Sequence, residues 1–112
     1  MDRMFDRYQE LAARTENDKL LPSEQLSNYA LGLAGETGEL VDLFKKLLYH
    51  GHPLDRDAIK DEAGDALWYL AMLLRKVGIS FEDVARENIG KLRVRYPNGF
   101  SENDSLNRKE SR

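Results

Sequence analysis

The sequence contains no cysteine, which excludes disulfide bonds and thiolate metal sites. It also has no long hydrophobic run. The longest strongly apolar stretch, residues 66–74, is far shorter than the roughly 18 residues of a membrane-spanning helix. The first seven residues lack the apolar core of a signal peptide. We therefore expect a cytoplasmic protein with no membrane partner.

The basic residues form no long run, and the net charge of the 112-residue chain is −3. A surface that binds nucleic acid through many phosphate contacts is therefore not expected. Hydrophobic residues make up 41% of the chain and charged residues 33%, as in a globular protein with a well-solvated exterior. This length is enough for one domain but too short for two independent ones. We place that domain at residues 1–100 and a polar, flexible tail at residues 101–112.

Alternation with period two is missing as well, so the pattern predicts no strands. Apolar residues instead recur every three or four positions, which predicts four amphipathic helices. Pro22 favours the start of the second helix, Gly51 and Pro53 lie in a turn, Gly78 ends the third helix and Pro97 ends the fourth. The predicted helices cover residues 2–13, 22–49, 56–77 and 81–96. The expected fold class is all-α, a four-helix bundle.

The third predicted helix is apolar nearly all the way round between Ala66 and Leu74. A small monomeric bundle could not cover such a surface on every side. We therefore expect the bundle to assemble as an oligomer, a homodimer or a homotetramer.

Two acidic pairs are the most informative feature of the sequence. Glu36 and Glu39 lie in the second predicted helix, and Glu62 and Asp65 in the third. Residues three apart share one face of a helix. No lysine or arginine stands three or four positions from any of these acids, so the negative charges have no local partner.

Hairpin geometry predicts that the four acids meet. Glu39 lies about 15 Å from the end of its helix and Glu62 about 10 Å from the start of the next, at 1.5 Å per residue. The intervening loop can absorb this difference, so an antiparallel hairpin places Glu39 opposite Glu62 and Glu36 opposite Asp65. A cation bound between them would neutralise the repulsion. Oxygen ligands alone favour Mg²⁺ or Mn²⁺ over Zn²⁺. The alternative is two acidic pairs that occur by chance on solvated helix faces.

Three glycines inside the second predicted helix accompany the acids: Gly32, Gly35 and Gly38. Each costs up to about 1 kcal/mol of helix stability relative to alanine. Their spacing makes a smooth stripe, which suits either close helix packing or room for a ligand.

The two motifs together resemble those of the MazG-like all-α nucleotide pyrophosphohydrolases. The resemblance covers residues 26–96 and rests on three segments. These are Leu33-Ala-Gly-Glu-Thr-Gly-Glu-Leu40, Asp61-Glu-Ala-Gly-Asp-Ala-Leu67 and Lys91-Leu-Arg-Val-Arg-Tyr-Pro97. The last segment looks most like the dCTP pyrophosphatase branch. That branch also has an aromatic residue on the second helix where this chain has Lys46, and this departure weakens the inference of a cytosine preference.

The resemblance implies a metal site and a reaction. Mg²⁺ held by Glu36, Glu39, Glu62 and Asp65 would bind a nucleoside triphosphate, and water would attack the α-phosphorus to give a monophosphate and pyrophosphate. A carboxylate that is not fully used as a metal ligand could accept the proton from the water. We expect Glu39 to be this catalytic base, with Glu36 as the alternative.

Substrate contacts are expected from two further groups. Asn88, Lys91 and Arg95 share one face of the fourth predicted helix and match polar positions of the family, which suits them to phosphate oxygens. The alternative is that basic residues near a helix C-terminus simply complement its dipole. Trp68 and Tyr69 could stack on a base, or could belong to the core.

Two other functions remain open on the sequence alone. The first is a non-enzymatic helical interaction module, in which the acids would not need to converge. The second is hydrolysis of another diphosphate-containing nucleotide by the same metal site. The residues do not separate these substrates.

Overall fold

The computed structural model describes residues 2–108, and within them the protein is all-helical. The first helix, α1, spans Met4–Ala12 and continues as a short 3₁₀ turn over Ala13–Thr15. The long helices α2 and α3 span Pro22–Tyr49 and Arg56–Lys76. Helix α4 spans Phe81–Arg95, and a short α5 spans Glu102–Leu106. These elements confirm the predicted all-α class.

Local chemistry explains where the helices begin and end. Pro22 is the first residue of α2, where its missing N–H costs nothing. The Asp55 carboxylate accepts a hydrogen bond from the Ala58 N–H and so caps α3. The Ser80 hydroxyl accepts one from the Asp83 N–H and caps α4. Gly78, with φ of +77°, makes the turn that separates α3 from α4.

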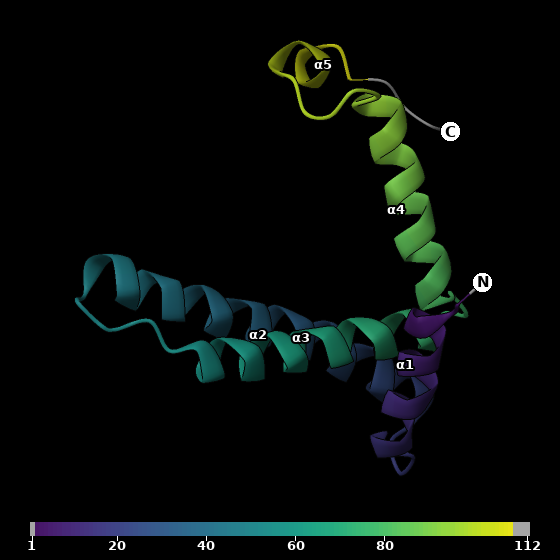
Figure 1. The fold of residues 1–112 in the computed structure, drawn as a ribbon. Coiled ribbons are helices and arrows are strands. Elements are labelled where there is room, and N and C mark those ends of the chain that lie inside the picture. The colour runs from purple at the N-terminus through teal and green to yellow at the C-terminus, as the bar shows by residue number, and fades with distance from the viewer. Residues whose placement is uncertain (1, 109–112) are drawn as a thin grey trace.

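Helices α2 and α3 form a long antiparallel hairpin, and α1 crosses the end of the hairpin that is opposite its connecting loop (Figure 1). Helix α4 packs mainly on α1 and extends away from the hairpin. The single chain therefore does not close into the four-helix bundle that the periodicity predicted. Its radius of gyration is 17.3 Å, against about 13 Å for a compact chain of this size.

A small core lies where α1, α2, α3 and α4 meet. Its buried apolar side chains are Tyr29, Ala71, Met72 and Phe81. Many large apolar side chains outside this core are exposed, among them Leu31, Val41 and Leu48 of α2.

The joint between α1 and α4 is made by polar groups that cap each other. Asp6 of α1 accepts hydrogen bonds from the Ser80 hydroxyl, at 2.6 Å, and from the Glu82 N–H, at 2.9 Å. Glu82 in return accepts one from the Phe5 N–H at 3.1 Å. Each helix thus supplies a carboxylate to the free N–H groups at the start of the other.

Buried Gln9 completes this joint. Its side-chain amide donates to the carbonyl oxygens of Ala71 and Ile79 and accepts from the Phe81 N–H. One side chain therefore holds α1, the end of α3 and the start of α4 together.

Helix α5 lies inside the segment that was expected to be a flexible tail, and the Ser101 hydroxyl caps it by accepting from the Asp104 N–H. The last part of that expected tail, residues 109–112, lies outside the described residues. No helix among residues 2–108 is both long enough and apolar enough to cross a membrane.

Candidate metal centre

Three of the four predicted acids converge in the middle of the α2–α3 hairpin. Carboxylate oxygens of Glu36, Glu62 and Asp65 all lie within 4.8 Å of one another. Glu36 comes from α2 and the other two from α3, so the antiparallel pairing of the helices creates the cluster. The hairpin geometry predicted that all four acids would meet, and this group contains three of them but not Glu39.

The fourth acid, Glu39, lies at the edge of this group. The Glu62 carboxyl group raises the pKa of Glu39, first through a hydrogen bond between the two groups and then through their repulsion. The pKa of Glu62 is also raised, and its contact with Glu36 is the largest cause. Negative charge is therefore concentrated enough at this place to hold protons more tightly than usual.

The cluster contains oxygen atoms that nothing else satisfies. Oε2 of Glu36 and Oε2 of Glu62 are buried and have no hydrogen-bond partner among residues 2–108. Buried carboxylate oxygens without a partner are costly. Such oxygens, in a set made only of carboxylates, fit a hard divalent cation such as Mg²⁺. The residues present therefore fit the metal that the sequence pattern suggested.

A shallow hollow adjoins the acids on the α2 side. Gly35 and Gly38 form part of its floor, and Glu39 and Glu62 line one end. A Cβ atom at Gly35 or Gly38 would meet no atom within 4 Å. Among residues 2–108 these two glycines are therefore not needed for packing, and they keep the space beside the acids open.

Trp68, one helical turn beyond Asp65 on α3, is partly buried and packs against the core. Its Nε1 donates to the Ala12 carbonyl oxygen and to the Thr15 hydroxyl, each at 3.0 Å. Its ring packs edge-on against Tyr29 and Tyr69, with centroids 5.6 and 5.2 Å away. These contacts give Trp68 a packing role, and its predicted stacking on a base gains no support from them.

Tyr69 packs against the backbone of Gly32. It lies one helical turn beyond Asp65 on α3 and so remains beside the acidic cluster.

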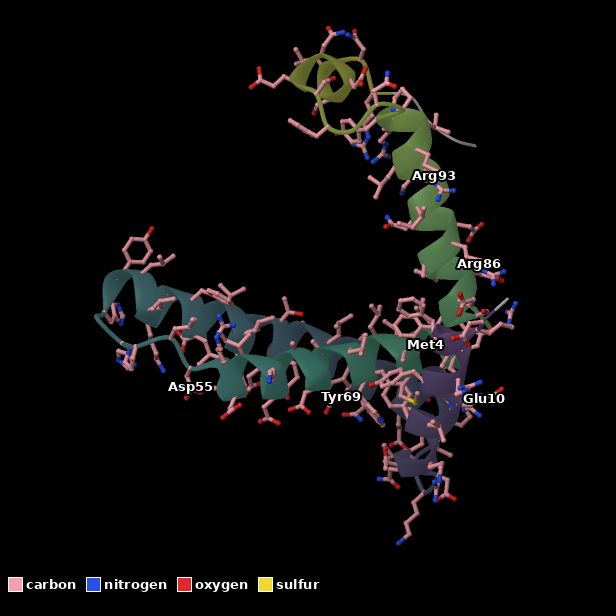
Figure 2. The ribbon with its side chains drawn as sticks, viewed as in Figure 1. Met4, Glu10, Asp55, Tyr69, Arg86 and Arg93 are labelled. Carbon is pink, nitrogen blue, oxygen red and sulfur yellow. The ribbon has the colours of Figure 1, made fainter. Side chains whose placement is uncertain are left out.

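The predicted phosphate contacts lie elsewhere in the chain. Asn88, Lys91 and Arg95 belong to α4, which extends away from the hairpin that carries the acids, as the labelled Arg86 and Arg93 show (Figure 2). A single chain does not bring these three residues to the carboxylates. Sequence spacing alone could not reveal this, because the direction of α4 depends on hydrogen bonds between α1 and α4 that involve Asp6, Gln9 and Glu82.

His50 and His52 lie in the loop between α2 and α3, away from the acids in the chain. The site also has a basic neighbour, Lys46. Lys46 lines the far end of the shallow hollow and pairs with Asp42 at 3.1 Å. Lys46 lies seven residues, or two helical turns, beyond Glu39 on the same side of α2. This spacing could have placed it beside the acids from the sequence alone.

Comparison with known proteins gives the site a family context. The model of the MazG nucleotide pyrophosphohydrolase domain matches residues 24–100, which include all four acids. The chain is also 33% identical over 89 residues to the Gene 37 protein of Mycobacterium phage L5, covering 76% of this chain and 78% of that protein. No solved structure gives a significant match. The converging carboxylates lie inside the matched domain. The chain therefore belongs to the MazG nucleotide pyrophosphohydrolase family.

Proposed function

We propose that this protein hydrolyses a nucleoside or deoxynucleoside triphosphate to the monophosphate and pyrophosphate in the presence of Mg²⁺. The observation that carries the proposal is the meeting of Glu36, Glu62 and Asp65 inside a domain of this family, with buried oxygens that find no hydrogen-bond partner in the described part of the chain. Glu36, Glu39, Glu62 and Asp65 would hold the metal. When bound, Mg²⁺ supplies positive charge that offsets the phosphates and makes water more acidic.

The chain's own residues have distinct tasks in this reaction. The oxygen of water forms a bond to the α-phosphorus, the bond from that phosphorus to the bridging oxygen breaks, and pyrophosphate leaves. Glu39 accepts the proton of the attacking water. Its position outside the three-oxygen group favours this role over that of Glu36.

The nucleotide preference is part of the proposal. The resemblance of residues 91–97 to the dCTP pyrophosphatase branch supports dCTP as the first substrate to test, and Lys46 in place of an aromatic residue argues for testing every common base. The family resemblance also suggests a role in removing unwanted nucleotides from the cellular pool.

We propose further that the working form is a homodimer or homotetramer. The extended shape, the small core and the exposed apolar residues of α2 support this assembly. Sedimentation velocity checks it, because a monomer at micromolar concentration would contradict the proposal.

Product analysis tests the reaction. The protein is incubated with each common nucleoside and deoxynucleoside triphosphate, with and without Mg²⁺, and the products are separated by chromatography. Metal-dependent monophosphate and pyrophosphate are expected. Release of inorganic phosphate instead would identify a different bond as the one broken, and the absence of turnover for all nucleotides would favour a helical interaction module.

A further inference from the structure

The loop between α4 and α5 contains an asparagine that is followed directly by a glycine. These residues are Asn98 and Gly99, and Asn98 is the one asparagine of the chain that precedes a glycine. The loop lies at the end of α4 that is remote from the hairpin (Figure 1). Chemistry at this place is therefore separate from the proposed reaction at the acidic cluster.

Residues 96–99 form a tight turn. The Gly99 N–H donates a hydrogen bond to the Tyr96 carbonyl oxygen at 3.2 Å, with Pro97 and Asn98 as the two central residues. No non-glycine residue among residues 2–108 has a positive φ, which excludes a type II turn with Asn98 at its third position. Gly99 has φ of +87°, a conformation that glycine adopts without steric cost.

Little holds this turn closed. Residues 97–100 are all exposed, and the 3.2 Å bond lies at the long end of the range for N–H···O hydrogen bonds. The Asn98 side chain has no hydrogen-bond partner within residues 2–108, whereas the side-chain oxygens of Asn17 and Asn103 both accept hydrogen bonds. The turn can therefore open by a local motion while the helices stay folded.

Opening of the turn frees the backbone nitrogen of Gly99 to reach the side chain of Asn98. This nitrogen loses its proton to base and bonds to Cγ, the bond from Cγ to Nδ2 breaks, and ammonia leaves after taking up a proton from solvent. A five-membered cyclic imide remains. Water then adds to one of its two carbonyl carbons and opens the ring. Opening at Cγ gives aspartate, and opening at the main-chain carbonyl carbon gives isoaspartate, in which the chain runs through Cβ and Cγ.

We propose that Asn98 is a site of spontaneous deamidation in the folded protein, through attack by the Gly99 nitrogen. Glycine at position 99 favours the reaction because it has no Cβ to hinder the approach of its nitrogen to the neighbouring side chain. The overall reaction consumes one water and releases one ammonia, and it needs no enzyme or cofactor. Because one neutral amide becomes a carboxylate, the net charge changes from −3 to −4.

Both products change the junction between α4 and α5. The new carboxylate lies three residues beyond Arg95, the last residue of α4, where the helix dipole disfavours a negative charge. Isoaspartate also adds one carbon to the backbone between Tyr96 and Phe100, whose rings pack across the turn with centroids 5.4 Å apart. Backbone amide NMR signals of α5 should therefore change as the protein ages, while those of the hairpin stay unchanged.

Ageing of the intact protein tests the proposal. Freshly purified protein is incubated at pH 6 and at pH 8, and the products are analysed by anion-exchange chromatography and peptide mass spectrometry. We expect a more acidic form that is heavier by about 1 Da per chain, with the change in the peptide that contains Asn98. This form should appear faster at pH 8, where the Gly99 nitrogen loses its proton more readily. A mass change that maps to another asparagine instead would overturn the proposal.

Matched variants separate this site from slow hydrolysis of other amides. Asn98→Gln keeps an amide group but would have to close a larger ring, and it should form no acidic product while the wild type does. Asn103→Gln is the control, because Asn103 precedes an aspartate and lies in α5, and it should age as the wild type does. Equal ageing of Asn98→Gln and the wild type would refute the site.

Unfolded protein provides a further comparison. In urea the turn is lost, so Asn98 should deamidate faster there than in the folded protein. Deamidation that occurs only in urea would contradict the proposal, because it would show that the bond from Gly99 to Tyr96 keeps the turn closed in the folded state. None of these measurements depends on nucleotide turnover, so the result is distinguishable from success or failure of the proposed activity.

Discussion

Tyr69 packs its ring directly on the backbone of Gly32, so that an ideal Cβ at position 32 would lie 2.5 Å from Cδ1 and from Cζ of the tyrosine. The next two glycines of the same helix differ, because a Cβ at Gly35 or Gly38 would meet nothing within 4 Å. Three glycines that look equivalent in the sequence therefore have two different roles.

Alanine substitutions should separate these roles. Gly32→Ala forces the Tyr69 ring away from its place beside Trp68, and we expect a loss of about 1–3 kcal/mol in the free energy of unfolding. Gly35→Ala meets no atom and should gain up to about 1 kcal/mol from its higher helix propensity. Urea unfolding followed by circular dichroism measures both. Equal stabilisation by the two substitutions would contradict the close packing at Gly32.

Loss of a single carboxylate should abolish turnover. Glu39→Gln removes the proposed proton acceptor and is expected to reduce kcat by about 10²–10⁴. Asp65→Asn should have a comparable effect by weakening the metal site, while helical content stays unchanged in both variants. Steady-state kinetics with the preferred triphosphate provides the measurement. Full activity in either variant would remove that residue from the proposed chemistry.

Mg²⁺ should stabilise the folded protein. A ligand that binds only the folded state at one hundred times its Kd raises the free energy of unfolding by about 2.7 kcal/mol. Thermal unfolding is compared with and without Mg²⁺ at constant ionic strength, next to Glu62→Gln. We expect the wild type to shift and the variant to shift much less. A shift of equal size in both would indicate metal binding elsewhere.

The acidic cluster should also make the metal-free protein less stable as the pH rises. The pKa of Glu62 is raised above its ordinary value of 4.5, so the folded state holds the proton more tightly than the unfolded state. This contribution to stability is fully present below pH 4.5 and is lost as the pH rises through the raised pKa.

Chemical unfolding in EDTA, measured from below pH 4.5 to above the raised pKa of Glu62, checks this loss of stability. Glu62→Gln carries no charge to lose and should show a flatter profile than the wild type. Parallel profiles for the two proteins would show that the carboxylates do not interact in the folded state.

Asp6 should produce the opposite dependence at lower pH. Its pKa is lowered from 3.8 to about 2, first by the hydrogen bond from the Ser80 hydroxyl and then by the one from the Glu82 N–H. The folded state therefore releases this proton more readily than the unfolded state. The stabilisation is fully present above pH 3.8 and is lost as the pH falls towards 2.

Acid titration of Asp6→Asn tests this contribution, with Asp2→Asn as a charge-matched control in the exposed N-terminal segment. Asp6→Asn should lose stability at neutral pH and depend less on pH between 4 and 2 than the control. Identical acid profiles would contradict the capping role of Asp6.

The sequence predicted the hairpin and its acids because both depend on local rules. Helical period places Glu36 and Glu62 on the inner faces, and the Asp55 cap with a short loop fixes the register. The direction of α4 could not be predicted, because it depends on hydrogen bonds between residues more than seventy positions apart, such as Asp6 with Glu82. For the same reason the sequence pattern could not show that Asn88, Lys91 and Arg95 lie away from the carboxylates of the same chain.

The polar joint between α1 and α4 has a consequence for folding order. The N–H of Phe5 and the carboxylate of Glu82 are 77 positions apart, so joining them closes a long loop at a substantial entropic cost. The hairpin, whose contacts are closer in sequence, can form first. On a ribosome, α1 must wait until the start of α4 has been synthesised before its capping partners exist. The joint between α1 and α4 therefore forms after the hairpin, although α1 precedes the hairpin in the chain.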